Sequence, residues 1–456
     1  MLFGCHNLAA KLNAKRRRGG NMKRIVICMD GTWQSLRQDK PTNIGLIARS
    51  IAHKETLHDA NGSVTGYVPQ TVIYTQGVGS NIGALTKLTF GSWLLALVNR
   101  TFGGALGDGL EDGILDTYLR LAFNYEEGDE IYIFGFSRGA FAARRLAGVI
   151  NTSGIISRRF VNKAWEAFQL YHDAPGENAT QEELLEHAAK TLKFRQDYGK
   201  GGRNPDGSRF TIDTPPAITY LGVFDTVMQR GAAQVLDSMF PKLGRRYRFK
   251  NLRICPNVKS ARHAMAVDEA RLGFPPTPWE GLEEANAVAQ RRDHADPGYA
   301  YYQQRWFVGM HGDVGGGDGS ALAAATLKWI TDGAAKMGLR FYAKHGADIS
   351  PMDEEIAHAG PELYRAPISR PKLLEALKLQ NWTGPARRIW ADRNRRPSAE
   401  DIVLYLDDTV VQRACDDDVK PRYKPRALRP FKDVLKDVAK AERKAERAAE
   451  RAARSG

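Results

Sequence analysis

The motif Gly-x-Ser-x-Gly occurs at residues 135–139, between a predicted strand and a predicted helix. The β-branched and aromatic run at 130–133 precedes the motif, and the helix-forming run at 141–147 follows it. Glycine at both outer positions allows the backbone to turn tightly beside a neighbouring strand or helix, so Ser137 can adopt a strained and exposed conformation. The pattern predicts a nucleophile elbow, with the Ser137 hydroxyl at the tip of one strand of a parallel sheet.

Two backbone N–H groups are candidates for holding an oxyanion beside the serine. Arg138 follows the serine at the start of the predicted helix, where N–H groups point out of the helix end. The predicted strand 24–29 ends in a polar turn, from which the N–H of Gly31 or Thr32 would be the second donor. An ordinary Asp-Gly turn is the alternative for this segment. A phosphatase of the haloacid dehalogenase type is excluded, because the position of its nucleophilic aspartate holds Cys28.

An acid and a base follow two later predicted strands. Asp225 comes directly after the apolar run 218–224, and His311 follows the apolar run 305–310 in a glycine-rich loop. With Ser137 they stand in the chain order Ser, Asp, His, which is the order of α/β-hydrolases and differs from the orders of chymotrypsin and subtilisin. We therefore expect His311 to act as the base and Asp225 to orient it.

Other residues compete for these roles. Asp313 and Asp268 are alternative acids, and His263 is the alternative base. His263 lies in a segment with a helical pattern, residues 262–269, where a histidine is more often packed or exposed than catalytic. The histidines are not at ligand spacing and the chain has no HExxH motif, so we expect neither a metal ion nor a cofactor.

The net charge of +14 belongs mainly to the two ends of the chain. Residues 1–24 contribute about +7 and residues 420–456 about +8, so the segment between them is close to neutral. A specific nucleic-acid surface would need Lys and Arg clustered on the folded body, which the sequence does not indicate. We expect the basic tails to give at most weak affinity for anionic membranes. The four cysteines include no CxxC pair, which favours a reducing compartment and argues against a disulfide framework or a zinc site.

The predicted organisation is one α/β domain between two basic tails. Residues 1–21 lack the apolar stretch of a secretory signal and are expected to form a disordered leader. Residues 22–430 form the domain, in which the apolar stretch 82–106 is a core helix or a lid and 160–213 is a helical insertion. Charges interrupt 82–106 below membrane-spanning length, so we expect a cytoplasmic protein. Residues 431–456 are predicted to form an alanine-rich helix.

Several blocks of sequence together resemble one enzyme family. These blocks are residues 29–33, 135–140, 222–227, 263–269 and 311–317. In this order they are similar to an α/β-hydrolase family, long known as a domain of unknown function, that includes the catalytic domains of type VI secretion phospholipase effectors. The resemblance spans residues 22–428 and implies a triad of Ser137, Asp225 and His311 that acts on ester bonds, in some members those of phospholipids. The alternative is a binding or scaffold protein on a catalytically silent hydrolase fold, and export by a type VI system is not indicated.

Overall fold

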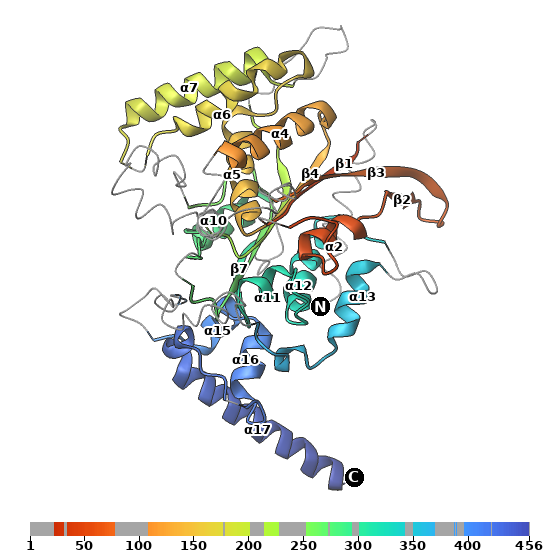
Figure 1. Ribbon diagram of the computed structural model, residues 1–456, viewed down its shortest axis with the longest axis vertical. Helices are drawn as coiled ribbons and strands as arrows, with labels where there is room; N and C mark the ends of the chain where they lie inside the picture. The colour runs from red at the N-terminus through yellow and green to blue at the C-terminus, as the bar shows by residue number, and fades with distance from the viewer. Residues whose placement is uncertain are drawn as a thin grey trace, which may run out of the picture.

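The computed structural model has a seven-stranded sheet at its centre, formed by the described part of the chain (Figure 1). The described residues are 22–31, 34–77, 108–176, 178–200, 214–227, 252–271, 274–293, 301–342, 350–369, 387, 389, 396–420 and 422–455. The predicted leader 1–21 and the predicted helix or lid 82–106 lie outside them.

The strands lie next to one another in an order that differs from their order in the chain. Their bounds are β1 Arg24–Met29, β2 Lys54–His58, β3 Val64–Thr75, β4 Glu130–Phe136, β5 Ile218–Phe224, β6 Ala261–Ala266 and β7 Tyr302–Phe307. The order across the sheet is β2-β3-β1-β4-β5-β6-β7. Strand β2 pairs antiparallel with β3, and the other pairs are parallel. The predicted α/β fold with a mostly parallel sheet is therefore confirmed.

Strand β6 corrects one expectation from the sequence. The segment around His263 has a helical pattern of residues, but Ala261–Ala266 is a strand that is buried along its whole length. A strand inside a parallel sheet has no solvent face, so it lacks the alternation of apolar and polar residues that identifies half-exposed strands. Its polar side chains bond inside the protein instead, as Arg262 does when its Nη1 donates to the Trp329 carbonyl.

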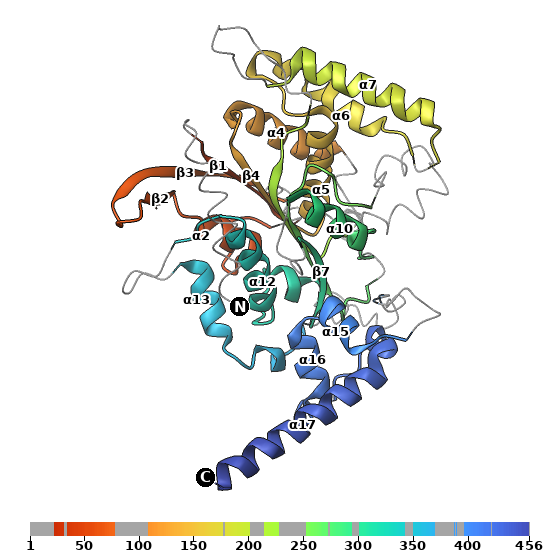
Figure 2. The ribbon, with the colours of Figure 1, turned by 180° about the vertical axis from the view of Figure 1, so that it is seen from behind.

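Helices cover both faces of the sheet (Figure 2). One side carries α4 Asp108–Asn124, α5 Arg138–Ser153, η1 Arg158–Lys163, α6 Ala164–His172, α7 Gln181–Tyr198 and α10 Leu282–Asp293, and the other carries α2 Asn43–Ser50, α12 Ala323–Lys336 and α13 Pro351–Ala359. Strand β1 separates the two cores: Ile25 and Ile27 pack with α4 and α5, whereas Val26 and Cys28 pack with α2 and α12. Helices α6 and α7 fall within the predicted insertion, of which residues 201–213 lie outside the described part.

The C-terminal helices pack against the end of the sheet at β6 and β7. They are η2 Leu363–Arg365, α15 Ala399–Tyr405, α16 Asp408–Cys415, η3 Arg426–Phe431 and α17 Lys432–Ser455, at the blue end of the colour range in Figures 1 and 2. A third core joins them to the sheet, in which Trp306 packs with Ile402, Val410 and Phe431. Leu435 is buried near the start of α17, whereas the far end of that helix extends away from the sheet. No described helix is both long and apolar enough to cross a bilayer.

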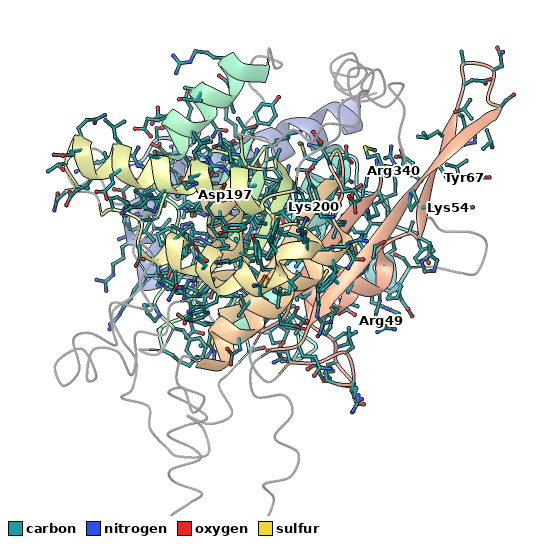
Figure 3. The ribbon with its side chains drawn as sticks, turned by 90° about the horizontal axis from the view of Figure 1, so that it is seen from above. Arg49, Lys54, Tyr67, Asp197, Lys200 and Arg340 are labelled. Carbon is teal, nitrogen blue, oxygen red and sulfur yellow. The ribbon has the colours of Figure 1, made fainter. Side chains whose placement is uncertain are left out.

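Charged side chains lie along the exposed edge of the sheet at β2. Lys54 Nζ is 3.9 Å from the centre of the Tyr67 ring, and Figure 3 shows both side chains at the same end of the sheet as Arg340. Arg340 forms an ion pair of 2.8 Å with Glu55, which also binds the buried Arg24 at 2.6 Å. A charged edge strand discourages pairing with the edge of another chain.

Candidate active site

The sheet reverses its direction of winding at β1 and β4. These two strands are neighbours, but β1 leads to α2 on one face and β4 leads to α5 on the other. A crevice forms outside the carboxyl ends of the strands at such a reversal, and α/β proteins bind ligands there. Gly31 follows β1 and Ser137 follows β4, so two of the predicted site residues lie at this position.

Ser137 occupies a strained turn between β4 and α5. Its φ of 58° and ψ of −122° are values that residues other than glycine rarely adopt. A Cβ at Gly135 would come within 2.5 Å of the Gly139 carbonyl oxygen, and a Cβ at Gly139 would come within 2.2 Å of the Met29 carbonyl oxygen. Both glycines are therefore required where α5 approaches β4 and β1, as the motif predicts.

Ser137, Asp225 and His311 meet at the carboxyl ends of β4, β5 and β7. Ser137 Oγ lies 2.8 Å from His311 Nε2, and His311 Nδ1 lies 2.6 Å from Asp225 Oδ2. When Nδ1–H donates to the carboxylate, Nε2 is left to accept from the serine hydroxyl. All three side chains are buried. The arrangement can therefore pass the Ser137 proton to His311 along an existing hydrogen bond.

Aromatic packing fixes the His311 ring. Its centroid lies 4.8 Å from the ring centroid of Phe136 and 4.8 Å from that of Phe274. His311 begins the one-turn helix α11, His311–Gly315, rather than lying in the open glycine-rich loop that the sequence suggested. A Cβ at Gly315 would come within 1.9 Å of the Phe136 ring, so this glycine allows the turn to pack against the ring. Gly315 therefore serves close packing.

The Asp225 carboxyl group is fully buried. Burial alone would raise its pKa, but the guanidinium of Arg387 and the hydrogen bond from His311 hold the pKa well below its usual range. Arg387 Nη1 and Nη2 lie 2.5 and 3.0 Å from the two carboxylate oxygens. No sequence pattern identifies Arg387, which follows Asp225 by 162 residues.

The alternative base His263 is engaged away from the serine. Its Nε2 accepts the Thr226 N–H at 3.1 Å, and its Nδ1 lies 3.2 Å from the side-chain oxygen of Gln304. Burial, reinforced by the nearby Arg144, lowers the pKa of His263 to about 3. A neutral His263 thus supports the turn that follows Asp225.

The alternative acids Asp268 and Asp313 bind the backbone before His311 rather than its ring. Asp268 accepts the Gly309 N–H at 2.8 Å, and Asp313 accepts the Met310 N–H at 2.8 Å. Burial raises the pKa of Asp268 to about 6. Both carboxylates therefore position the segment that carries the histidine.

The predicted oxyanion donors differ in their surroundings. Arg138 is the first residue of α5, so its N–H has no carbonyl one turn earlier within the helix to bind. The Gly31 N–H instead donates to the Asp30 carboxylate at 2.7 Å, and Thr32 lies outside the described residues. Arg138 is therefore placed to donate to an oxyanion, whereas Gly31 would first have to release Asp30.

Asp30 anchors the loop after β1. Its carboxylate accepts the Thr42 hydroxyl at 2.9 Å and the Tyr74 hydroxyl at 2.6 Å. Thr42 is the N-cap of α2, and Tyr74 belongs to β3, so the loop is tied to both neighbouring elements. Burial raises the pKa of Asp30, and these hydrogen bonds oppose the rise.

Two ion pairs lie beside His311. Besides the pair of Arg387 with Asp225, Arg271 binds Glu269 at 2.7 Å, and Glu269 accepts the His311 N–H at 3.2 Å. Within the described ranges, no group of three or more His, Cys, Asp or Glu side chains is arranged to hold a metal ion.

A comparison with known families identifies the family of this chain. Residues 23–333 match the family described as "T6SS, Phospholipase effector Tle1-like, catalytic domain". The chain belongs to this family. The resemblance predicted from the sequence blocks is therefore confirmed, and the family is one of lipid-hydrolysing domains.

The sequence is also similar to that of one protein from yeast. The chain is 30% identical over 267 residues to the uncharacterized protein YEL023C of Saccharomyces cerevisiae, an alignment that covers 56% of this chain and 33% of the yeast protein. The chain thus spans about a third of that relative.

Two solved structures are also similar at low identity. An uncharacterized protein from Pseudomonas aeruginosa matches with a TM-score of 0.34 and 15% identity over 95% of this chain and 61% of that one. The Tle1 effector bound to the VgrG spike of the type 6 secretion system matches with a TM-score of 0.32 and 16% identity over 65% of this chain and 51% of that one. At these TM-scores neither structure carries an argument about this fold.

Proposed function

We propose that this protein is a serine hydrolase that cleaves carboxylic esters of lipids, with phospholipids as its substrate class and Ser137, His311 and Asp225 as its catalytic triad. The observation that carries the proposal is the hydrogen-bonded chain from the buried Asp225 carboxylate through His311 to the Ser137 hydroxyl at the elbow. Membership of a phospholipase family favours lipid esters over other esters.

The proposed reaction begins with acyl transfer to the enzyme. His311 Nε2 takes the Ser137 proton as Oγ attacks the ester carbonyl, and the Asp225 carboxylate stabilises the imidazolium that forms. The Arg138 N–H and a second donor from Gly31 or Thr32 bind the oxyanion of the tetrahedral intermediate. His311 then returns the proton to the leaving alcohol, which departs and leaves an acyl ester on the serine.

Water completes the reaction by the same groups. His311 accepts a proton from water as the water oxygen attacks the acyl ester. The second tetrahedral intermediate then collapses as His311 returns that proton to Ser137 Oγ, which releases the carboxylic acid and regenerates the serine. In this reaction the Gly31 N–H can donate to the oxyanion only if it first breaks its hydrogen bond to the Asp30 carboxylate.

The rival function is a binding or scaffold protein that keeps the hydrolase fold without its chemistry. A fluorophosphonate probe distinguishes the two, because only an activated serine displaces its fluoride and becomes phosphonylated. We expect the probe to label the wild-type protein at Ser137, mapped by mass spectrometry of the labelled peptide. Heat-unfolded protein and the Ser137→Ala variant are the unlabelled controls. A folded wild-type protein that stays unlabelled would favour the binding protein.

We also propose that the basic end of α17 holds the enzyme weakly on anionic bilayers. Lys440, Arg443 and Lys444 lie on the part of the helix that follows the buried Leu435 and Ala439. Basic residues near an anionic surface contribute up to about 1 kcal/mol each, and salt screens this attraction.

Deleting residues 441–456 should spare hydrolysis of a soluble short-chain ester and reduce hydrolysis of anionic vesicles, most clearly at low salt. The deletion removes the ion pair of Arg443 with Asp417, but both side chains are about half exposed and such a pair contributes little to folding. Vesicles of zwitterionic lipid are the control, since the deletion should not change their hydrolysis. Equal rates on anionic vesicles with and without the tail, at low ionic strength, would rule out this membrane role.

A further inference from the structure

A buried guanidinium from the C-terminal part of the chain lies behind the Asp225 carboxylate. Arg387 spans both carboxylate oxygens, with Nη1 2.5 Å from Oδ1 and Nη2 3.0 Å from Oδ2. The same two nitrogens donate to the carbonyl oxygens of Ala266 at 3.0 Å and Phe274 at 2.9 Å. Four hydrogen bonds therefore fix the plane of the guanidinium, and through it the plane of the carboxylate.

The direction of each carboxylate oxygen matters for the histidine. Oδ2 of Asp225 accepts from His311 Nδ1 at 2.6 Å, and Oδ1 accepts the Ala266 N–H at 3.0 Å. The terminal torsion of an aspartate is soft, so a carboxylate held by these two contacts alone could rotate. The paired contacts from Arg387 remove this freedom and keep Oδ2 directed at the imidazole.

We infer that Arg387 is a positioning residue of the proposed hydrolase: it keeps Asp225 oriented and charged, so that His311 holds the tautomer and direction that Ser137 needs. The inference rests on the proposed function and extends it to a part of the chain that the family match does not include. That match ends at residue 333, so the C-terminal part supplies this contact to the site.

Two other residues beyond the family match support the segment that carries His311. The Tyr423 hydroxyl donates to Asp268 at 2.8 Å, and the Ser369 hydroxyl donates to Asp313 at 2.7 Å. These are the two carboxylates that bind the backbone N–H groups immediately before the histidine. The C-terminal part thus contacts the acid directly, and it contacts the two carboxylates that hold the backbone before the histidine.

Replacing Arg387 with methionine should lower kcat for a soluble ester by about 100-fold and change KM little, because misdirecting the base slows the chemistry. Arg387 binds Asp225 rather than substrate, so binding should persist. Arg387→Lys keeps the charge but lacks the planar fork, and its kcat should fall less. Millimolar guanidinium should restore part of the activity of Arg387→Ala, whereas the same concentration of urea should not.

The pH profile separates positioning from a general loss of structure. In the wild type, burial opposes ionisation of Asp225, but Arg387 and His311 outweigh it and keep the pKa low. Without the guanidinium, one of the two groups that oppose burial is lost and the pKa of Asp225 rises, so Asp225 gains its proton at a higher pH. The acid limb of kcat should therefore move to higher pH in Arg387→Met. The other ionisable groups beside this pair, His263 and Glu269, are the same in both proteins.

Arg24→Met is the matched control. Arg24 is also a buried arginine, and it binds Glu55 at 2.6 Å and Glu130 at 2.9 Å at the amino end of β1, opposite the site. Its replacement should lower the melting temperature without moving the acid limb.

A wild-type kcat and an unmoved acid limb in folded Arg387→Met would overturn the inference while Ser137-dependent hydrolysis persists. If the methionine variant does not fold, Arg387→Lys decides, because a wild-type kcat without the planar fork would contradict the positioning role. Absence of Ser137-dependent hydrolysis in the wild type would instead contradict the proposed function itself.

Discussion

Replacing Ser137 with alanine should lower ester hydrolysis by about 10⁴-fold or more while the protein stays folded. The substitution removes the nucleophilic oxygen and adds no atom to a turn in which both flanking glycines already face backbone at close range. Alanine and serine resist the φ of 58° to a similar degree, so the strain of the turn should not change. Steady-state turnover of a soluble ester, with a thermal melt of the same sample, measures both quantities.

Ser153→Ala is the matched control for this experiment. Ser153 is a buried serine on the same helix, at the opposite end of α5 from Ser137, and its hydroxyl donates to the Ala167 carbonyl at 2.7 Å. Losing that bond should cost about 1 kcal/mol of folding free energy and leave turnover unchanged. Near wild-type turnover in the Ser137 variant would eliminate the serine mechanism, whatever the control shows.

Strands buried on both faces could be predicted well where their residues are β-branched or aromatic. The bounds of β1 and β5 follow from such runs, because each residue along them is buried and favours an extended backbone. Strand β2 could not be predicted in this way, since it is five residues long, half exposed and dependent on pairing with β3. The segment of β6 was predicted as helical because a strand buried along its whole length lacks the alternation of apolar and polar residues that identifies a half-exposed strand.

The candidate site was predictable as far as its residues follow strands. Ser137, Asp225 and His311 come directly after, or within a few residues of, the ends of β4, β5 and β7, so a parallel sheet brings them to one edge. Arg387 follows no strand, and only the three-dimensional return of the chain places it beside Asp225. The hydrogen bond from the Gly31 N–H to Asp30 was not predicted either, because the Asp30 carboxylate is held in place by Thr42 and Tyr74 on other elements.

Asp225→Asn should lower kcat by roughly 10³ to 10⁴-fold with little change in substrate binding. The asparagine amide can donate to His311 Nδ1, which favours the tautomer with a proton on Nε2. In the wild type Nε2 lies 2.8 Å from Ser137 Oγ. In the variant Nε2 already carries a proton, so it cannot accept the proton of Ser137. The measurement is kcat and KM on a soluble ester.

The Asp225→Asn variant also leaves Arg387 without its carboxylate partner, and a second substitution can remove that effect on stability. Losing the carboxylate leaves a buried, unpaired cation, which should destabilise the fold by about 3 to 5 kcal/mol. The double variant Asp225→Asn, Arg387→Met removes the stranded charge, so it should recover much of the stability but none of the turnover. Activity and stability are thereby separated in one pair of proteins.

Asp313→Asn identifies which carboxylate is the acid. Asp313 accepts from the backbone of Met310 and from the hydroxyl of Ser369, so its loss should loosen the segment before His311 without changing the tautomer. We expect a far smaller fall in kcat than in Asp225→Asn. A larger loss in Asp313→Asn, with Asp225→Asn still active, would transfer the role of the acid to the helix that carries the histidine. Arg387 would then hold a carboxylate that stabilises the fold but takes no part in the chemistry.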